Sequence, residues 1–379
     1  IIAIWTLVHG AAAYIPAFLQ SLGLIKSVDP AAYRLLFWGF GHGAQQVNLA
    51  AMVACWYALA ALTTGAKPVN EGLSRAAFVL YLIGINLGSI HHLLVDPGLS
   101  FHNRVINTSY LMYAATLGSL IHAFSIPAAV EAAQRAKGHT KGLFGWVKNA
   151  PWSQPGFSAL VISFVGFGFI AGVSGVMMGN VQLNMLIHNT LFVVGHFHST
   201  VVLGTTISFM GLAYYVVPLV ARKNLAFPKL AKWQPAIYGF GLVTLIGGMM
   251  MAGKLGAPRR SWDMSYESSA LSVDLFTGPH MKLATTILGI GAVIAVTGGV
   301  LFVLIMIGTI FFGKTVDRPH VGDLAIVAGP TGPVNKVPVP HDAEDFRGTK
   351  VLIYVFLAWF VVMFSVGLIN LARVKWFVG

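Results

Sequence analysis

The sequence predicts an all-α membrane protein, a polytopic bundle of about nine transmembrane helices forming one domain over residues 1–379. Three observations predict this class. Hydrophobic residues make up 56% of the chain and charged residues 9%, against about 25% charged in soluble domains. Apolar runs of roughly twenty or more residues recur, and each can cross a hydrocarbon core about 30 Å thick. The shorter, alternating runs of a strand-built barrel are absent from the sequence.

Each apolar run is expected to be a helix, because lipid cannot satisfy the polar groups of exposed backbone. The stretch from Lys314 to Lys350 is the most polar and contains Pro and Gly, so residues 314–349 are expected to form an extramembrane loop. The nine expected helices cover about 1–24, 34–63, 74–95, 103–135, 156–179, 185–221, 233–253, 281–313 and 350–376.

The net charge of +12 arises from basic residues in the loops. Their position indicates topology signals and lipid head-group contacts, so no nucleic-acid partner is expected. The loops after alternate helices hold about twice as many basic residues as the others, which predicts a cytoplasmic location for them and an outer location for the C-terminus. The residues are Lys67, Arg75, Arg135, Lys137, Lys141, Lys148, Arg222, Lys223, Lys229, Lys232, Lys314, Arg318, Lys336, Arg347 and Lys350.

The chain opens at Ile1 inside an apolar run, with neither a Met nor a signal-peptide pattern. We therefore expect a fragment, or an upstream portion that lies on a separate chain or is missing from this one. The single cysteine, Cys55, excludes a disulfide framework and a cysteine-built metal cluster within the chain. Any metal must be held by histidine or carboxylate.

Histidines at membrane depth indicate a functional site, because ionisable groups are costly there. His91 and His92 are adjacent in an apolar setting, which favours metal ligation over two hydrogen-bonded core residues. His42 could complete a three-imidazole site with an open position for a small ligand. His9, His122 and His188 are expected to be hydrogen-bonded structural residues.

His196 and His198 are two residues apart on one expected helix, so their side chains point to nearly opposite sides. They cannot easily bind one metal, but each could bind the iron of a different haem. The alternative is a pair of helix–helix hydrogen bonds. Arg259 and Arg260 are either a clamp for carboxylates such as haem propionates or ordinary interfacial charge.

Taken together, these motifs resemble the catalytic subunit of the haem–copper oxidase superfamily, and most closely its B family. The resemblance extends over nearly the whole chain and implies the C-terminal part of the subunit I fold. The segments that carry it are Phe37–His42, His91–Gly98, Gly142–Trp146, Pro151–Trp152, His188–Thr190, Gly195–His198 and Pro258–Arg260.

The resemblance implies two haems and one non-haem metal, either copper or iron. It also implies an electron-donor subunit of cytochrome c or copper type on the outer face of a bacterial or archaeal cytoplasmic membrane. Asn184 stands where an acidic residue is expected, and His188 where the family has a residue near the propionates. The implied ligands are His42, His91 and His92 for the non-haem metal, His196 for the high-spin haem, His198 for the low-spin haem, and Arg259 and Arg260 for the propionates.

Two departures from the family pattern matter. About four helices that precede this region in the family have no counterpart here, so the second ligand of the low-spin haem is expected from missing helices or a second chain. The tyrosine expected four residues after the first metal histidine is replaced by Gln46, next to Gln45. In another family the tyrosine lies six residues before the histidine pair, and here that position is Ile85.

The missing tyrosine favours nitric oxide over oxygen as the substrate. In the superfamily scheme, cleavage of O2 needs four electrons and the tyrosine supplies the fourth, whereas coupling two NO to N2O and water needs two. A glutamine cannot be oxidised under these conditions, so Gln46 either hydrogen-bonds a ligand histidine while O2 is reduced slowly with an outside electron, or the site reduces NO. In the second case Gln45 or Gln46 could offer a carbonyl oxygen or orient the bound ligand. However, known nitric oxide reductases of the superfamily carry glutamates at the non-haem iron, and the second helix has none. An O2-reducing cytochrome c or quinol oxidase therefore stays open, as do a non-catalytic haem electron-transfer protein and a transporter with histidine proton relays.

Overall fold

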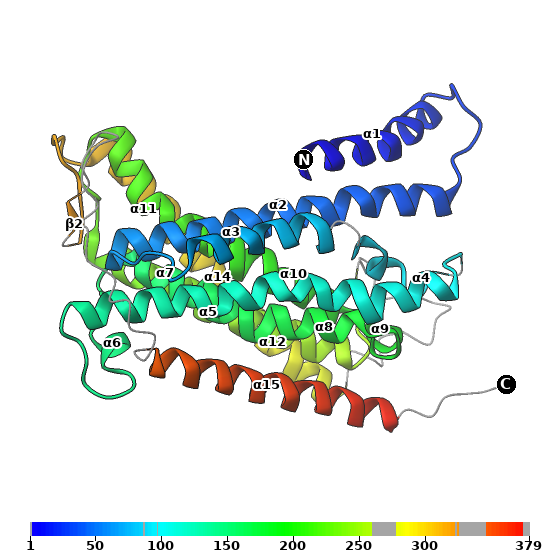
Figure 1. Cartoon of the computed structure of the whole chain (residues 1–379). Helices are drawn as coiled ribbons and strands as arrows, with labels where there is room; N and C mark the ends of the chain where they lie inside the picture. The colour runs from blue at the N-terminus through cyan, green and yellow to red at the C-terminus, as the bar shows by residue number, and fades with distance from the viewer. Residues whose placement is uncertain are drawn as a thin grey trace.

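The structure, a computed structural model, describes residues 2–85, 88–96, 98–259, 278–322, 324–325 and 346–373. Long helices run roughly side by side and form a bundle (Figure 1). Within the described residues, seven helical runs are long and apolar enough to cross a membrane. The predicted all-α class is therefore confirmed.

Three of the seven long helical runs contain a π-helical segment, and all three π segments border the candidate site; a fourth follows α3. The helical elements are α1 (Ile2–Ser21), α2 (Pro30–Thr64), α3 (Glu71–Leu80), η1 (Tyr81–Ile85), η2 (Gly88–Leu93), α4 (Phe101–Ile106), η3 (Asn107–Leu111), α5 (Met112–Ala136), α6 (Gly145–Lys148), α7 (Pro155–Gly166), η4 (Phe167–Gly172), α8 (Val173–Gly179), α9 (Val181–Ile187), α10 (Leu191–Phe197), η5 (His198–Thr206), α11 (Ile207–Ala221), α12 (Pro228–Lys254), α14 (Pro279–Phe312) and α15 (Arg347–Ala372).

Each of the nine predicted ranges contains helix, but three differ in detail. The first range, which holds α1, and the third, which holds α3, η1 and η2, are not among the seven candidate spans. The range 185–221 is divided: α9 ends at Ile187 and α10 begins at Leu191. The break follows from local chemistry, since Asn189 has a positive φ of 59° and the Thr190 hydroxyl caps α10 by accepting from the N–H of Phe192 at 3.2 Å.

The predicted loop 314–349 is described only in part. His320–Val321 (β1) and Leu324–Ala325 (β2) pair as two short antiparallel strands. An isolated bridge between Lys223 and Thr315 ties this loop to the turn after α11. Residues 326–345 lie outside the described part of the chain.

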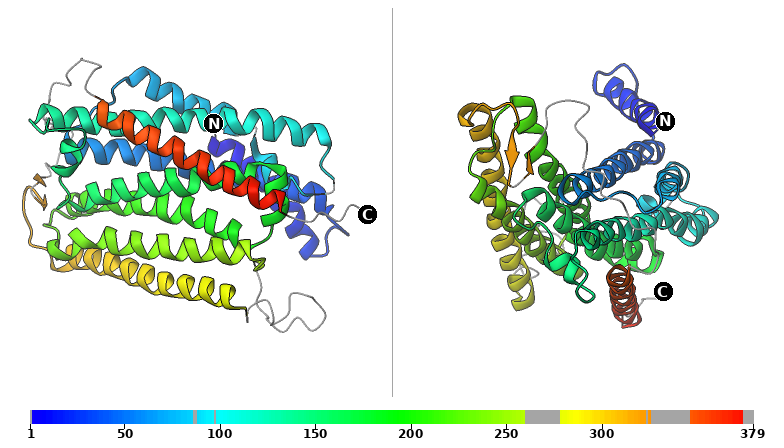
Figure 2. Two further views of the ribbon diagram at one scale, coloured as in Figure 1. Left: turned by 90° about the horizontal axis from the view of Figure 1, so that it is seen from below. Right: turned by 60° about the vertical axis from the view of Figure 1, so that its left-hand side comes forward.

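The helices differ in how tightly they are packed. Figure 2 shows α12 and α14 lying side by side along their length, while α15 lies along another side of the bundle. α1 packs against α2. The main buried cluster is formed by α2, α5, α7 and α11 and includes Trp56, Leu59, Phe157 and Tyr214. These packed helices position the histidines described next.

Candidate metal and haem site

Three imidazoles from two segments meet in the bundle. His42 comes from α2, and His91 and His92 come from the 3₁₀ segment η2. One ring nitrogen of each lies within 4.8 Å of the others, and Nδ1 of His42 is 3.2 Å from Nε2 of His92. Neutral imidazole nitrogens at these separations could converge on one metal ion. The structure thus brings together the three residues that the sequence indicated.

A cavity of about 220 Å³ adjoins the three imidazoles. Residues from η3, η4 and η5 help to line it, so π segments surround the site, as they often do at functional positions. His196 lies on its wall, whereas His198 is not among the lining residues. The two histidines of α10 and η5 therefore face different surroundings, which agrees with the helical spacing.

His196 has a fixed ring orientation. Its Nδ1 is 2.9 Å from the hydroxyl of Ser174, and that hydroxyl donates to the carbonyl of Ile170 at 2.6 Å. The hydroxyl proton is used in this second bond, so the Nδ1–H of His196 is the donor to Ser174. Nε2 then carries the lone pair that an iron ligand needs. Gly175 makes room for the ring, since a Cβ there would lie 3.1 Å from Cε1 of His196.

His198 is oriented in a comparable way by the backbone. Its Nδ1–H donates to the carbonyl of Val194, one turn earlier, at 2.9 Å. The lone pair of a neutral ring is therefore on Nε2, away from its own helix. Both histidines thus have the tautomer that fits an axial haem ligand.

Asn184 and His188 form a hydrogen-bonded pair whose orientation is fixed. The amide of Asn184 donates to the carbonyl of Met178 at 2.7 Å, which leaves its oxygen to accept from Nδ1 of His188 at 3.1 Å. Both residues line the cavity, as does Arg259. Burial, and then the positive charge of Arg259, lower the pKa of His188. Arg260 lies outside the described residues.

Gln45 and Gln46 also line the cavity. The side-chain nitrogen of Gln46 is 3.2 Å from Nε2 of His42, one helical turn away. No tyrosine lies among the described residues that line the cavity. Tyr57 of α2 and Tyr81 of η1 are engaged elsewhere: Tyr57 contacts Nδ1 of His122 at 3.0 Å, and Tyr81 contacts Ser119 at 3.0 Å.

Sequence reasoning missed two residues that support the site. Trp38 stacks on His92 with ring centroids 3.8 Å apart and an interplanar angle of 3°. Ser174 holds His196. Trp38 could have been found, because it lies one turn before His42 and so shares its helix face. Ser174 comes from a different helix, and no pattern in the sequence links it to His196.

Comparisons with known proteins agree with this geometry. Residues 1–294 match the family described as cytochrome c and quinol oxidase polypeptide I. Cytochrome c oxidase subunit 1 of Thermus thermophilus is 33% identical over 244 residues, covering 64% of this chain and 43% of the relative. The subunit of the same name from Debaryomyces hansenii is 26% identical over 227 residues, covering 58% and 34%. The chain thus spans less than half the length of these two relatives.

A solved structure of a heme-copper terminal oxidase dimer has the same fold. It superposes with a TM-score of 0.74 at 22% sequence identity, and the match covers 97% of this chain and 63% of that one. The expected correspondence to the subunit I fold is therefore confirmed at the level of the fold.

Proposed function

Because the chain belongs to the family of cytochrome c and quinol oxidase polypeptide I, we propose that it is the catalytic part of a membrane-bound respiratory reductase that converts NO to N2O. His42, His91 and His92 would hold a non-haem copper or iron, His196 would hold a high-spin haem, and His198 would hold a low-spin haem. The two metals at the cavity would together supply the two electrons that the coupling of two NO molecules needs.

The observation that carries the choice of NO is the contact between Gln46 and His42. An oxidisable phenol at this point would provide one more electron and a proton for the cleavage of O2. The amide of Gln46 provides neither, and the described cavity lining contains no tyrosine. A reaction that needs two electrons therefore fits these side chains better than one that needs four.

Gln46 then acts by orienting His42. Nδ1 of His42 faces His92, so Nδ1 is the nitrogen that would bind the metal. A neutral imidazole bound through Nδ1 carries its proton on Nε2, beside the amide. Amide oxygen and nitrogen are interchangeable in position, so in the loaded protein the oxygen of Gln46 accepts the Nε2–H of His42. Gln45 is left to contact the bound gas.

Oxygen reduction is the second candidate. It is favoured by the two relatives, both named cytochrome c oxidase subunit 1, and by the absence of glutamate among the cavity-lining residues that the structure describes. The three imidazoles suit copper as well as iron. A nitric oxide reductase built on a B-family, oxidase-like scaffold would also account for the similarity to these relatives and for the missing glutamates.

Further parts complete the proposal. An electron-donor subunit of cytochrome c or copper type binds at the outer face, and a segment outside this chain supplies the second ligand of the low-spin haem. Asn184, His188, Arg259 and Arg260 contact the propionates. Because Asn184 is neutral, it stores no proton there, and besides its place beside the propionates it holds the tautomer of His188.

The test is to supply one electron donor to the purified holoprotein and to measure N2O formed from NO and O2 uptake in parallel. We expect N2O as the main product and slow O2 uptake. Changing Gln46→Tyr should raise the ratio of O2 uptake to N2O formation, whereas Val165→Tyr is the control, because Val165 is exposed on α7 and does not line the cavity. Rapid O2 turnover without N2O would defeat the choice of NO. A haem spectrum with no CO-reactive haem would instead indicate an electron-transfer protein.

A further inference from the structure

A second, larger cavity lies beside the candidate site. It has a volume of about 520 Å³, opens to the surface, and is lined by α4, η3 and the start of α5 on one side and by α8 and α9 on the other. These elements lie at the same end of the bundle (Figure 1). We call this cavity the vestibule and define it by its polar lining residues Arg104, Thr108, Ser109, Asn180 and Gln182.

The vestibule and the reaction cavity share two wall residues, Met112 of α5 and Val176 of α8. Met112 reaches across to α8, because a Cβ added at Gly179 would lie 2.6 Å from its Cε and 3.2 Å from its Sδ. The two side chains therefore form a partition between the cavities. A methionine is well suited to such a place, since its unbranched side chain changes rotamer readily.

Polar groups around the vestibule indicate that water fills it. The Nε of Arg104 is buried and has no partner among the described residues, although its Nη2 donates to the carbonyl of Asp96 at 2.9 Å. The side chains of Thr108, Ser109, Asn180 and Gln182 add further polar groups to the walls of the vestibule. Buried donors and acceptors of this kind are normally satisfied by ordered water. An apolar occupant such as a lipid chain would leave them unsatisfied.

We propose that the vestibule is an aqueous route between the protein surface and the reaction cavity, and that Met112 and Val176 gate it. Water formed in the reaction leaves this way, and small polar ligands enter this way. Apolar gases need no such route, because they dissolve in the lipid. Since NO and O2 reduction both form water, the proposal holds for either substrate.

Ligand-binding kinetics test the gate. In the oxidised holoprotein, Met112→Ala should raise the rate of cyanide binding to the high-spin haem by about tenfold, which corresponds to a barrier lowered by about 1.4 kcal/mol. Val176→Phe should slow cyanide binding by a similar factor. Binding of CO to the reduced protein should change little in either variant. Val165→Phe is the control, because Val165 is 44% exposed on α7 and lines neither cavity.

Thiol labelling tests whether water fills the vestibule, and its readout does not depend on the haem. Cys55 is the chain's only cysteine and is buried, so an introduced cysteine can be labelled selectively. A water-soluble methanethiosulfonate reagent should modify Ser109→Cys in the holoprotein in lipid nanodiscs, but not Val165→Cys, which is exposed on the candidate membrane span Pro155–Gly179. Failure to label position 109 would overturn the aqueous vestibule. Equal cyanide rates in wild type and both partition variants would overturn the gate.

The two proposals fail in different ways. A protein that shows no Soret band and binds no cyanide contradicts the haem ligands of the proposed function, and thiol labelling then still decides whether the vestibule is aqueous. A protein that binds cyanide at one rate in every variant contradicts the gate alone.

Discussion

Single neighbouring side chains decide how the imidazoles of the site are oriented. Trp38 fixes the plane of His92 by stacking on it, and Ser174 fixes the tautomer of His196 by accepting its Nδ1–H. Second-sphere contacts of this kind typically change metal affinity or activity by about 10-fold to 100-fold. The orientation of the candidate ligands, and with it the metal affinity of the site, therefore depends on these neighbouring side chains as well as on the ligands.

The Ser174 contact leads to a prediction. In Ser174→Ala, the Nδ1–H of His196 loses its acceptor, so the ring becomes a weaker electron donor and its orientation is less restricted. We expect a lower iron–histidine stretching frequency in the resonance Raman spectrum and haem retention reduced by about tenfold. Ser208→Ala is the control, because Ser208 is equally buried and donates to the carbonyl of Thr205. An unchanged stretching frequency in Ser174→Ala would show that the contact does not influence the ligand.

The candidate ligands could be predicted because their spacing is local. His91 and His92 are adjacent, and the i, i+2 spacing of His196 and His198 fixes opposite directions on a helix. A three-imidazole site with His42 could be proposed from the sequence, and the family resemblance implied the same set, but no spacing pattern required it, since α2 and η2 are brought together by long-range packing. Ser174 could not be predicted for the same reason, because its contact joins residues 22 positions apart on different helices.

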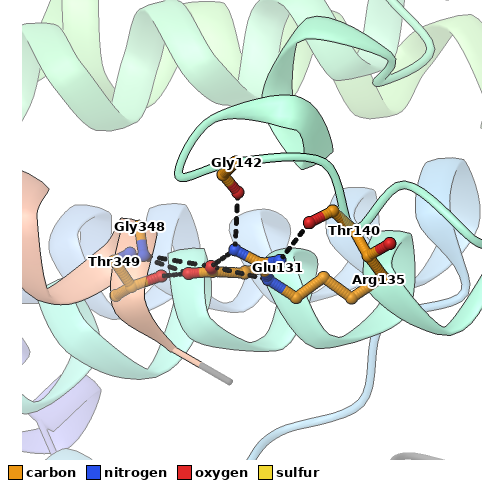
Figure 3. A network of polar contacts seen from close by, with 6 residues as sticks. All are labelled: Glu131, Arg135, Thr140, Gly142, Gly348 and Thr349. Atoms are coloured by element: carbon orange, nitrogen blue, oxygen red, sulfur yellow. Dashed lines mark hydrogen bonds and ion pairs between the residues drawn. The ribbon is translucent and has the colours of Figure 1, made fainter. Parts of the chain in front are cut away.

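At the scale of elements, the start of α15 is held by a buried carboxylate from another helix. Glu131 of α5 is 0% exposed and accepts from the N–H groups of Gly348 at 3.1 Å and Thr349 at 2.7 Å (Figure 3). The first N–H groups of a helix lack partners within it and favour negative charge. The hydroxyl of Thr349 also donates to this carboxylate at 2.7 Å, and Arg135 donates to it through Nε at 2.9 Å and balances its charge.

Removal of this carboxylate should loosen α15. In Glu131→Ala the guanidinium of Arg135 and two backbone N–H groups lose their acceptor, which typically costs about 3–5 kcal/mol for a broken buried pair. We expect a lower midpoint of thermal unfolding in detergent and earlier proteolytic release of α15. Glu71→Ala should change stability by less than about 1 kcal/mol, because its ion pair with Arg75 is exposed. Equal effects of the two changes would contradict the role of Glu131.

Glycines set the spacing of α12 and α14. A Cβ at Gly291 would lie 2.2 Å from the backbone nitrogen of Leu245, and one at Gly248 would lie 2.4 Å from that of Leu288. Small residues allow helices in membranes to approach so closely. The two segments could be predicted from their apolar length, but their close contact could not, because glycine in a helix does not reveal which neighbour it faces.

Gly291→Ala should therefore separate the two helices. The new methyl group would overlap the backbone of Leu245, which cannot move away as a flexible side chain could, and overpacking typically costs about 1–3 kcal/mol. Gly289→Ala is a matched control on the same helix, because a Cβ there has nothing within 4 Å. We expect the thermal midpoint of Gly291→Ala to fall while that of Gly289→Ala stays equal or rises. The opposite order would contradict the contact.

At the scale of the whole molecule, the basic loops lie at one end of the bundle because successive long helices alternate in direction. The ends of α2, α5, α11 and α14 and the short helix α6 lie there, opposite α4 and α9 (Figure 1). The bridge between Lys223 and Thr315 joins two of these loops directly. The loop charges predicted that alternate loops lie on the same side of the membrane. In the structure these loops lie at the same end of the bundle.

Orientation in the membrane stays a prediction that follows from this asymmetry. An excess of Lys and Arg marks the cytoplasmic side, so the end that carries Lys141 should face inward and the end that carries Lys282 outward. Both side chains are exposed, and their Lys→Cys variants form a matched pair in a chain whose own cysteine is buried. In intact cells, an impermeant thiol reagent should modify Lys282→Cys at once and Lys141→Cys only after lysis. The reverse pattern would place the vestibule on the cytoplasmic side, so that water would leave inward.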